Sequence, residues 1–403
     1  MIDFTIPPDL DDLRTRVATF VREEILPAEE RMPEGHLDEE ALAQLRQRAR
    51  DLKLWAPHLP PEWGGLGVGP LGMALISQEL GVSAIAPLVL NCSAPDEGNM
   101  HLLEKAATHE QKERYLRPLA AAEVRSCFAM TEQASGADAA GLKSRAVRDG
   151  DNWIINGEKW FITGAAGAAF AIVVAVTNPD VAPQKGMSLF LVDADTPGWE
   201  VVREIPVMGT HSPGGHCEVR LNNITIPASQ MLGAEGQGFA LAQIRLGPAR
   251  LAHCMRWIGM AQRALDIATA RARTRKTFGA PLAERQAIQW MLADSAMDLY
   301  AARLMVLHSA WLIEQDRPYR QEVSMAKVYV AEALDRIVDR AIQVCGSLGY
   351  STDLPLERFY RDARAARIYD GPSEVHRMVI ARNVLKASKD EDGSTKSACG
   401  GLA

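Results

Sequence analysis

The spacing of apolar residues changes twice along this chain, and that change restricts the possible folds more than any other feature. In residues 1–125 apolar side chains recur three and four positions apart, which is typical of amphipathic helices. Residues 126–235 contain short β-type runs such as "AFAIVVAV" and "MSLFLVD", separated by Gly, Pro, Asn and Asp. Long helical segments return in residues 236–390. Because helices and strands do not alternate, most doubly wound nucleotide-binding folds are excluded.

These regions predict an α+β protein with three domains and a tail. We expect a helical domain over 1–125, an antiparallel β domain over 126–235 and a helix bundle over 236–390. Residues 391–403 are small, polar and Gly-rich, which predicts a flexible tail. The dipeptide Asn156-Gly157 stands between two β-type runs and favours a hairpin turn there.

Charge and cysteine content bear on partners and compartment. A net charge of -7 argues against general affinity for nucleic acid or anionic membrane, because phosphates attract Lys and Arg. The cysteines are scattered, without a CxxC pair or a disulfide framework, which favours a reducing compartment. The first residues lack the basic-then-apolar order of a signal peptide, and no stretch approaches the roughly 20 apolar residues needed to span a bilayer. We therefore expect a cytoplasmic protein that binds neither nucleic acid nor membrane.

One glycine-rich segment matches the spacing of a dinucleotide-binding motif. Gly67, Gly69 and Gly72 in "GVGPLG" satisfy the pattern G-x-G-x-x-G. That motif needs a hydrophobic strand before it, whereas "PPEWGG" precedes these glycines and Pro70 lies among them. The context predicts a turn that leads into a helix.

Another segment, "HSPGGHCE", offers candidate metal ligands. His211 and His216 could act with Cys217 or Glu218, but they lie in a Gly-Pro loop without the helical spacing of a hydrolytic zinc motif. A loop that lines a pocket fits the segment better, so we predict no metal site. The chain also lacks the G-x-S-x-G motif of serine hydrolases.

Six sequence blocks occur in an order that resembles the acyl-CoA dehydrogenase family. They are "FAMTEQASGAD", "NGEKWFITGA", "GMSLFLVDADTPG", "RKTFGAPLAERQAI", "QVCGSLGY" and "RDARAARIYDGPSEVHR". The resemblance covers nearly the whole chain and implies an N-terminal helical domain, a middle β-barrel-like domain and a C-terminal four-helix bundle. It also implies FAD as cofactor, an acyl-CoA substrate, an electron-transfer flavoprotein as electron acceptor, and a homodimer or homotetramer.

The same resemblance implies which residues contact FAD. Gly136 would lie near the pyrophosphate, and Ala137 follows it where the family usually has Ser, whose hydroxyl could donate a hydrogen bond to a phosphate. The implied contacts of the isoalloxazine ring are Phe128, Met130, Thr131, Phe161 and Thr163, with Phe161 in place of the more frequent Trp. The implied contacts with the FAD of a neighbouring subunit are Arg275, Thr277, Phe278 and Gln286, those on the adenosine side are Gln343, Gly346 and Ser347, and Glu374 takes a position often filled by Gln.

The catalytic base is implied to be Asp370, which stands in "YDG" where the family usually has Glu. Breaking the C–H bond alpha to a thioester needs a base while hydride leaves the beta carbon to flavin N5. A carboxylate buried beside an aromatic residue and an acyl chain loses hydration, which makes it a stronger base. Asp is shorter than Glu by ~1.5 Å, yet a subgroup with "DGP" and "EVH" looks similar, so we predict a working base. The alternative is a solvent-exposed turn residue, because Asp-Gly is a common turn pair.

Three further residues are implied to bind substrate. Arg250 would lie near the thioester, although a solvated helix-surface arginine is the alternative, and Tyr369 and Gly371 flank the base. Some family members carry the base directly before this arginine, where this chain has Ala249. Trp257 is a candidate for core packing or for a pocket wall, with core packing favoured.

Two other functions stay open at this point. A flavin-dependent oxidase or oxygenase would keep the fold and pass electrons to oxygen, and no sequence feature decides oxygen reactivity. A weakly catalytic binding flavoprotein would fit a missing carboxylate and a basic surface, whereas this chain has Asp370 and is acidic. The "DGPSEVH" resemblance suggests a medium, branched or functionalised acyl chain.

Overall fold

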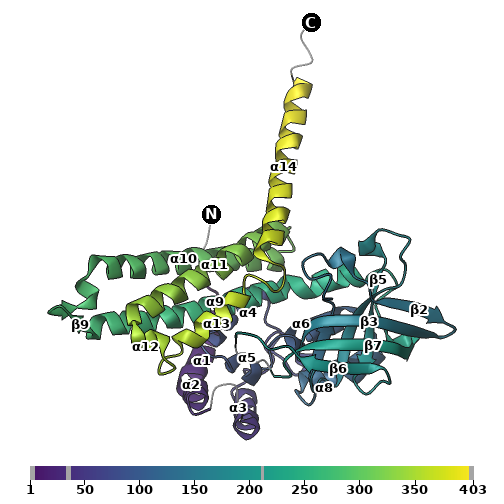
Figure 1. The fold of residues 1–403 in the computed structure, drawn as a ribbon, viewed down its shortest axis with the longest axis horizontal. Helices are drawn as coiled ribbons and strands as arrows, with labels where there is room; N and C mark the ends of the chain where they lie inside the picture. The colour runs from purple at the N-terminus through teal and green to yellow at the C-terminus, as the bar shows by residue number, and fades with distance from the viewer. Residues whose placement is uncertain (1–4, 33–37, 210–212, 399–403) are drawn as a thin grey trace. The chain divides into compact units, whose positions relative to one another are not determined.

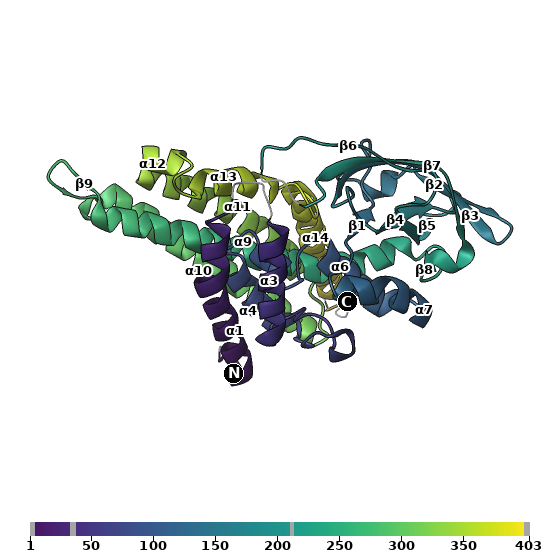
Figure 2. The same ribbon diagram turned by 90° about the horizontal axis from the view of Figure 1, so that it is seen from below.

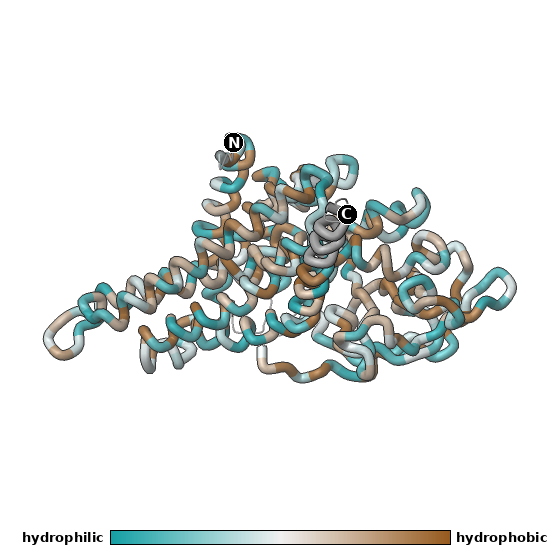
Figure 3. Tube along the Cα trace, turned by 90° about the horizontal axis from the view of Figure 1, so that it is seen from above, coloured by the Kyte–Doolittle hydropathy of each residue, from teal (hydrophilic) through white to brown (hydrophobic). Residues whose placement is uncertain are grey.

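The computed structural model describes residues 5–32, 38–209 and 213–398. The chain divides into two compact units, residues 1–252 and residues 253–403. Figure 3 shows hydrophilic and hydrophobic stretches alternating along the helices, as expected for amphipathic helices. Within the described part of the chain, no helix is both long and apolar enough to cross a membrane.

Helices form the first part of the first unit, as predicted. Gly69 is the N-cap of α4, and Gly67 before it has a left-handed φ of +66°, so "GVGPLG" is the expected turn and helix entry. The helical elements are α1 (Pro8–Phe20), the π-helix η1 (Val21–Ile25), α2 (Leu26–Glu29), α3 (Glu39–Asp51), η2 (Pro61–Trp63), α4 (Pro70–Leu80), α5 (Ala86–Val89), α6 (Asp96–Ala106), α7 (His109–Gln111), the π-helix η3 (Lys112–Leu116) and α8 (Arg117–Ala120).

An eight-stranded sheet follows, with strand order β6-β7-β3-β2-β4-β5-β8 and with β1 paired to β4 (Figure 1). Most neighbours are antiparallel, as predicted. However, β1 runs parallel to β4, and β2 meets β4 in one parallel pair, so the sheet is mixed at β4. The strands are β1 (Ser126–Ala129), β2 (Arg145–Asp149), β3 (Asn152–Thr163), β4 (Phe170–Val176), β5 (Met187–Asp193), β6 (Trp199–Glu204), β7 (His216–Pro227) and β8 (Met231–Leu232), and the short helices between them are η4 (Ala139–Gly141), η5 (Pro183–Lys185) and η6 (Ala228–Gln230).

Strand β4 is buried on both faces, which explains its uninterrupted apolar sequence. Phe170 and Ile172 belong to the core that contains the buried residues of the first helices, whereas Ala171 and Val173 belong to a second core inside the β domain. Successive side chains of a strand point to opposite faces, so one strand serves both cores. Full burial of each large apolar side chain stabilises the fold by about 1.5–3 kcal/mol.

The predicted hairpin at Asn156-Gly157 is wrong. Strand β3 continues through both residues and pairs with β2 on one side and β7 on the other, so two neighbours hold it extended. The turn signal instead marks an irregularity, because the register with β7 shifts between Ile155 and Gly157. A Cβ on Gly157 would lie 2.2 Å from the Ser144 hydroxyl oxygen, so glycine serves a close approach here.

The second unit is helical, as predicted. The part of α9 that belongs to this unit lies beside α10 and α11 in Figures 1 and 2. Helix α14 starts beside α11 and then extends away from it. Helix α14 continues to Ala398, into residues assigned to the tail, and residues 399–403 lie outside the described part. The elements are α9 (Gly238–Thr274), which begins in the first unit, β9 (Lys276–Thr277), β10 (Ala280–Pro281), η7 (Leu282–Glu284), α10 (Gln286–Glu314), α11 (Arg320–Cys345), α12 (Ser347–Tyr350), α13 (Leu356–Ala365) and α14 (Ser373–Ala398).

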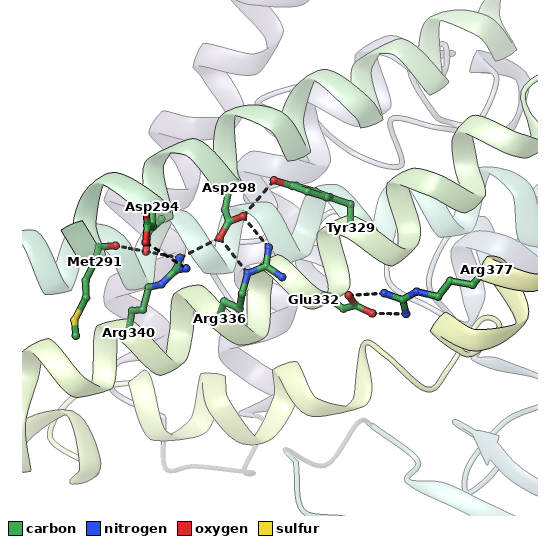
Figure 4. Close-up of polar contacts among 9 residues, drawn as sticks. Met291, Asp294, Asp298, Tyr329, Glu332, Arg336, Arg340 and Arg377 are labelled. Carbon is green, nitrogen blue, oxygen red and sulfur yellow. Dashed lines mark hydrogen bonds and ion pairs between the residues drawn. The ribbon is translucent and has the colours of Figure 1, made fainter. Parts of the chain in front are cut away.

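Charged side chains connect α10, α11 and α14 (Figure 4). Asp298 of α10 accepts hydrogen bonds from Arg336 at 2.7 Å and from Arg340 at 3.0 Å, both on α11. Glu332 of α11 forms a two-point ion pair with Arg377 of α14, at 2.6 and 2.8 Å. Two parallel N–H···O bonds fix geometry better than one, so this pair orients the start of α14.

Candidate active site

Asp370 lies in the loop between α13 and α14, and its backbone is unusual. It has φ +54°, and the next residue, Gly371, has φ +95°. Asp is among the few residues that enter the left-handed region readily, and Gly enters it without steric cost. A Cβ on Gly371 would lie 2.8 Å from Nε2 of His376, so no larger residue fits without a shift. The Asp-Gly pair therefore forms a turn, as one alternative expected, but the Asp370 side chain is only 21% exposed.

Two side chains hold the main chain of this loop. Lys327 of α11 is fully buried, and its ammonium donates to the carbonyl oxygen of Gly371 at 2.6 Å. His376 of α14 contacts the carbonyl oxygen of Asp370 through Nε2 at 3.2 Å and the Ser324 hydroxyl through Nδ1 at 3.1 Å. These two contacts hold adjacent carbonyl groups, so Lys327 and His376 together fix the main chain at the candidate base.

Three aromatic side chains form a cluster at the Asp370 carboxylate, which His253 contacts directly. Nε2 of His253 lies 3.3 Å from Oδ2 of Asp370. The His253 ring stacks on Trp257 at 5.9 Å and meets the edge of Tyr369 at 5.2 Å. The Trp257 indole donates to the Tyr369 hydroxyl at 2.9 Å. Tyr369 is 37% exposed, but its hydroxyl end is enclosed, and burial together with the negative charge of Asp370 raises the pKa of Tyr369. The hydroxyl therefore stays neutral.

His253 was not predicted from the sequence, and Trp257 is both buried and part of this cluster. The available signal was their spacing of four in "HCMRW", which places both side chains on one face of α9. That spacing does not reveal which loop the face contacts. Arg250 and Ala249 lie on the same helix, in the first unit.

In the first unit, the predicted ring contacts cluster at the ends of β1 and β3. Phe161 is 45% exposed and has a left-handed φ of +56°, where the register of β3 with β7 shifts. The Thr163 hydroxyl lies 2.9 Å from Nδ1 of His216. Strained backbone around an exposed aromatic side chain is typical of a ligand site, and a bulge commonly re-aims a side chain.

The candidate metal segment does not assemble a ligand group in the described residues. No set of three or more His, Cys, Asp or Glu side chains in those residues could hold a metal ion. His216 contacts Thr163 instead, and the Cys217 thiol donates to the Gly214 carbonyl at 3.4 Å. His211 lies outside the described residues.

A buried ion pair fixes the main chain next to Thr131. The ammonium of Lys159 donates to Glu132 at 2.9 Å and to the Met130 carbonyl at 3.0 Å. Glu132 also accepts from the backbone N–H of Lys143 at 2.6 Å. Burial lowers the pKa of Lys159 to about 8, although the Glu132 charge opposes that shift. Neither residue was predicted as part of a site.

The remaining predicted residues fall in four places. Gly136 and Ala137 are exposed in the loop after β1, and a Cβ on Gly136 would meet nothing within 4 Å, so space is open there. The β9–β10 tip between α9 and α10 carries Phe278, which is 99% exposed with φ +50°. Figure 1 shows this tip at the same end of the unit as α12. The tip holds Arg275, Thr277, Phe278 and Gln286, the end of α11 and start of α12 hold Gln343, Gly346 and Ser347, and the first turn of α14 holds an exposed Glu374.

The helical, β and helical parts of this chain match three family models in succession. The models describe the N-terminal, middle and C-terminal domains of acyl-CoA dehydrogenases and cover residues 7–123, 127–224 and 236–385. The site therefore belongs to a class of flavoprotein oxidoreductases. The chain belongs to the acyl-CoA dehydrogenase family, whose cofactor is FAD.

Individual proteins agree with this assignment. "Probable acyl-CoA dehydrogenase FadE2" of Mycobacterium tuberculosis is 40% identical over 402 residues, which is 96% of this chain and 98% of that protein. "Probable acyl-CoA dehydrogenase YngJ" of Bacillus subtilis is 35% identical and is covered completely. The structure of butyryl-CoA dehydrogenase from Megasphaera elsdenii superposes with a TM-score of 0.85 at 29% identity, over 95% of this chain and all of that one. The chain spans about half the length of the animal proteins named acyl-CoA dehydrogenase family member 11.

Proposed function

We propose that this protein removes hydrogen from the alpha and beta carbons of an acyl-CoA thioester to give the 2-enoyl-CoA, with Asp370 as the base. The observation that carries the proposal is the Asp370 carboxylate itself, which is mostly buried on a loop fixed by Lys327 and His376. A base with a fixed position reacts faster because less ordering remains before the transition state.

The residues of the first unit fit FAD. FAD, when bound, supplies the acceptor for the hydride that leaves the beta carbon. The open space at Gly136 leaves room for a phosphate group, and exposed Phe161 offers an aromatic surface. The residues assigned to the isoalloxazine ring are Phe128, Met130, Thr131, Phe161 and Thr163, with Gly136 and Ala137 at the pyrophosphate.

Residues of the second unit are assigned to the cofactor of a neighbouring subunit. A phenylalanine that is 99% exposed, Phe278, is costly in water and fits a site completed by a second copy of the chain. The assigned residues are Arg275, Thr277, Phe278 and Gln286 at the tip, Gln343, Gly346 and Ser347 on the adenosine side, and Glu374. A homodimer or homotetramer follows from this assignment.

The substrate side uses the base and its neighbours. Asp370 takes the alpha proton, while Tyr369 and Gly371 flank the acyl chain and Arg250 lies near the thioester. The neutral Tyr369 hydroxyl is held by Trp257, so this wall keeps its shape. We assign a medium, branched or functionalised acyl chain, an electron-transfer flavoprotein as acceptor, and a cytoplasmic location.

The test is an anaerobic titration of the FAD-loaded enzyme with a panel of acyl-CoAs, following flavin absorbance. Wild-type enzyme should bleach with at least one thioester, and the most effective one identifies the acyl class. Asp370→Asn should bind the same thioester without bleaching, because the amide cannot accept the alpha proton. Bleaching by Asp370→Asn at the wild-type rate would refute the base assignment, and a wild-type enzyme that no thioester bleaches would refute the reaction.

A further inference from the structure

We propose that His253 is a positioning residue whose Nε2–H donates to the carboxylate of Asp370. Arg256 donates to the other ring nitrogen of His253 and so fixes which nitrogen carries the proton. This inference rests on the proposed role of Asp370 as the base. It explains how the shorter Asp side chain is kept in one orientation.

The geometry sets the hydrogen-bond direction. The guanidinium of Arg256 lies 3.3 Å from Nδ1 of His253. A guanidinium can only donate, so Nδ1 of His253 must accept, and in the neutral ring the proton is then on Nε2. Nε2 is the atom that lies 3.3 Å from Oδ2 of Asp370. The three side chains therefore form one chain of donors that ends at the carboxylate.

The ring is also held in place by its stacking partners. Trp257 and Tyr369 contact two sides of the imidazole, at 5.9 and 5.2 Å between ring centres. Trp257 is in turn tied to Tyr369 by its hydrogen bond of 2.9 Å. His253 thus has little freedom to rotate, which is what a positioning residue requires.

Charged and titratable groups that contact the base loop or His253 lie on α9, α11 and α14 and in the loop itself. Arg256 is on α9 with His253, Lys327 is on α11, Tyr369 precedes the base in the loop, and His376 is on α14. The positive charge of Arg256 disfavours a second proton on His253, whereas the negative charge of Asp370 favours it. These opposed effects make the titration of His253 a direct report on both contacts.

The first measurement is an NMR titration of histidine-labelled, FAD-loaded enzyme, with the His253 signal assigned by its loss in His253→Gln. Asp370→Asn should move the midpoint of His253 to lower pH by about one unit, because an attractive charge is gone. Arg256→Met should move it to higher pH by about one unit, because a repulsive charge is gone. A midpoint that stays fixed in both variants would overturn the proposed chain.

The second measurement is the rate of flavin reduction by the best acyl-CoA as a function of pH. His253→Phe keeps an aromatic ring without N–H, so the Asp370 carboxylate loses a donor and its pKa should rise. The pH below which the rate declines should therefore move upward by about one unit, and below that pH the rate should fall up to about tenfold. His253→Gln restores a donor and should recover the rate to within about threefold of wild type. Substrate affinity should not change in either variant.

The two proposals fail in different ways. If Asp370→Asn reduces flavin at the wild-type rate, the base assignment is refuted regardless of the results for the His253 variants. If Asp370→Asn is inactive but His253→Phe keeps the wild-type rate and pH profile, the base assignment stands and the role of His253 is refuted.

Discussion

Two buried lysines, Lys159 in the β domain and Lys327 in the second unit, each fix a loop that carries candidate site residues, but they do so differently. Lys159 pairs with the carboxylate of Glu132, and together they hold the main chain around Thr131. Lys327 donates to the main chain of the base loop itself, at the Gly371 carbonyl. Lys159 therefore matters chiefly for stability, and Lys327 chiefly for the position of the base.

Lys159→Met should have the largest effect on stability. It leaves the Glu132 carboxylate buried without its cation, and breaking such a pair costs about 3–5 kcal/mol. Chemical denaturation of wild type and variant measures the loss. The double variant Glu132→Gln/Lys159→Met should recover part of it, and Lys185→Met, at an exposed lysine, should be nearly neutral. Equal losses for Lys159→Met and Lys185→Met would contradict the account.

Lys327→Met should lower the free energy of unfolding less than Lys159→Met does, but it should slow the reaction more. Removing the amine leaves the Gly371 carbonyl without its side-chain donor, which costs about 1–3 kcal/mol. The freed loop no longer fixes Asp370, so flavin reduction should slow more than about tenfold. Denaturation and stopped-flow reduction of the same preparation give both numbers. A variant that loses stability but reduces flavin at the wild-type rate would contradict the role of Lys327 in fixing the base.

Gly371→Ala probes the same loop from the other side. Its new methyl group would meet His376 in a backbone region that L-residues avoid, which costs about 1–3 kcal/mol. Gly64→Ala is the matched control, because Gly64 has a similar φ of +81° but nothing within 4 Å of its Cβ position. Thermal unfolding should show a larger loss for Gly371→Ala. Equal losses would mean that the contact with His376 adds nothing.

The smallest effect concerns pH. The pKa of Lys159 is lowered to about 8 in the folded protein from 10.5, so the unfolded chain binds more protons between these values. Stability from this residue therefore rises as pH increases through that range. The difference in unfolding free energy between wild type and Lys159→Met should widen by about 1–2 kcal/mol from pH 8 to pH 10. A constant difference in denaturation over this range would show that Lys159 does not titrate there.

Local patterns predicted the parts of the fold that local forces decide. The change from helical to strand spacing, and the helix entry at Gly69, depend on nearby residues and are confirmed. The Asn156-Gly157 signal failed because pairing of β3 on both sides outweighs turn preference. The parallel pairing of β1 with β4 depends on chain topology, which spacing does not encode.

The candidate site divides in the same way. Asp370 could be predicted from its motif, and the turn at Asp370-Gly371 could be predicted from the preference of Asp-Gly pairs for turns. The residues that contact this loop, Lys327 and His253, lie on helices far away in sequence. No local pattern distinguishes them from other lysines and histidines on helices. Only the folded helices show that both side chains reach the same loop.

The most direct test of the base isolates removal of the alpha proton from hydride transfer. Phenylacetyl-CoA has alpha hydrogens but none on its beta carbon, so an enzyme in D₂O can exchange the former without reducing flavin. Mass spectrometry should show alpha-deuterium incorporation by the FAD-loaded wild type, and a rate lower by at least about a hundredfold for Asp370→Asn. Exchange by Asp370→Asn at the wild-type rate would contradict the account and place the base elsewhere.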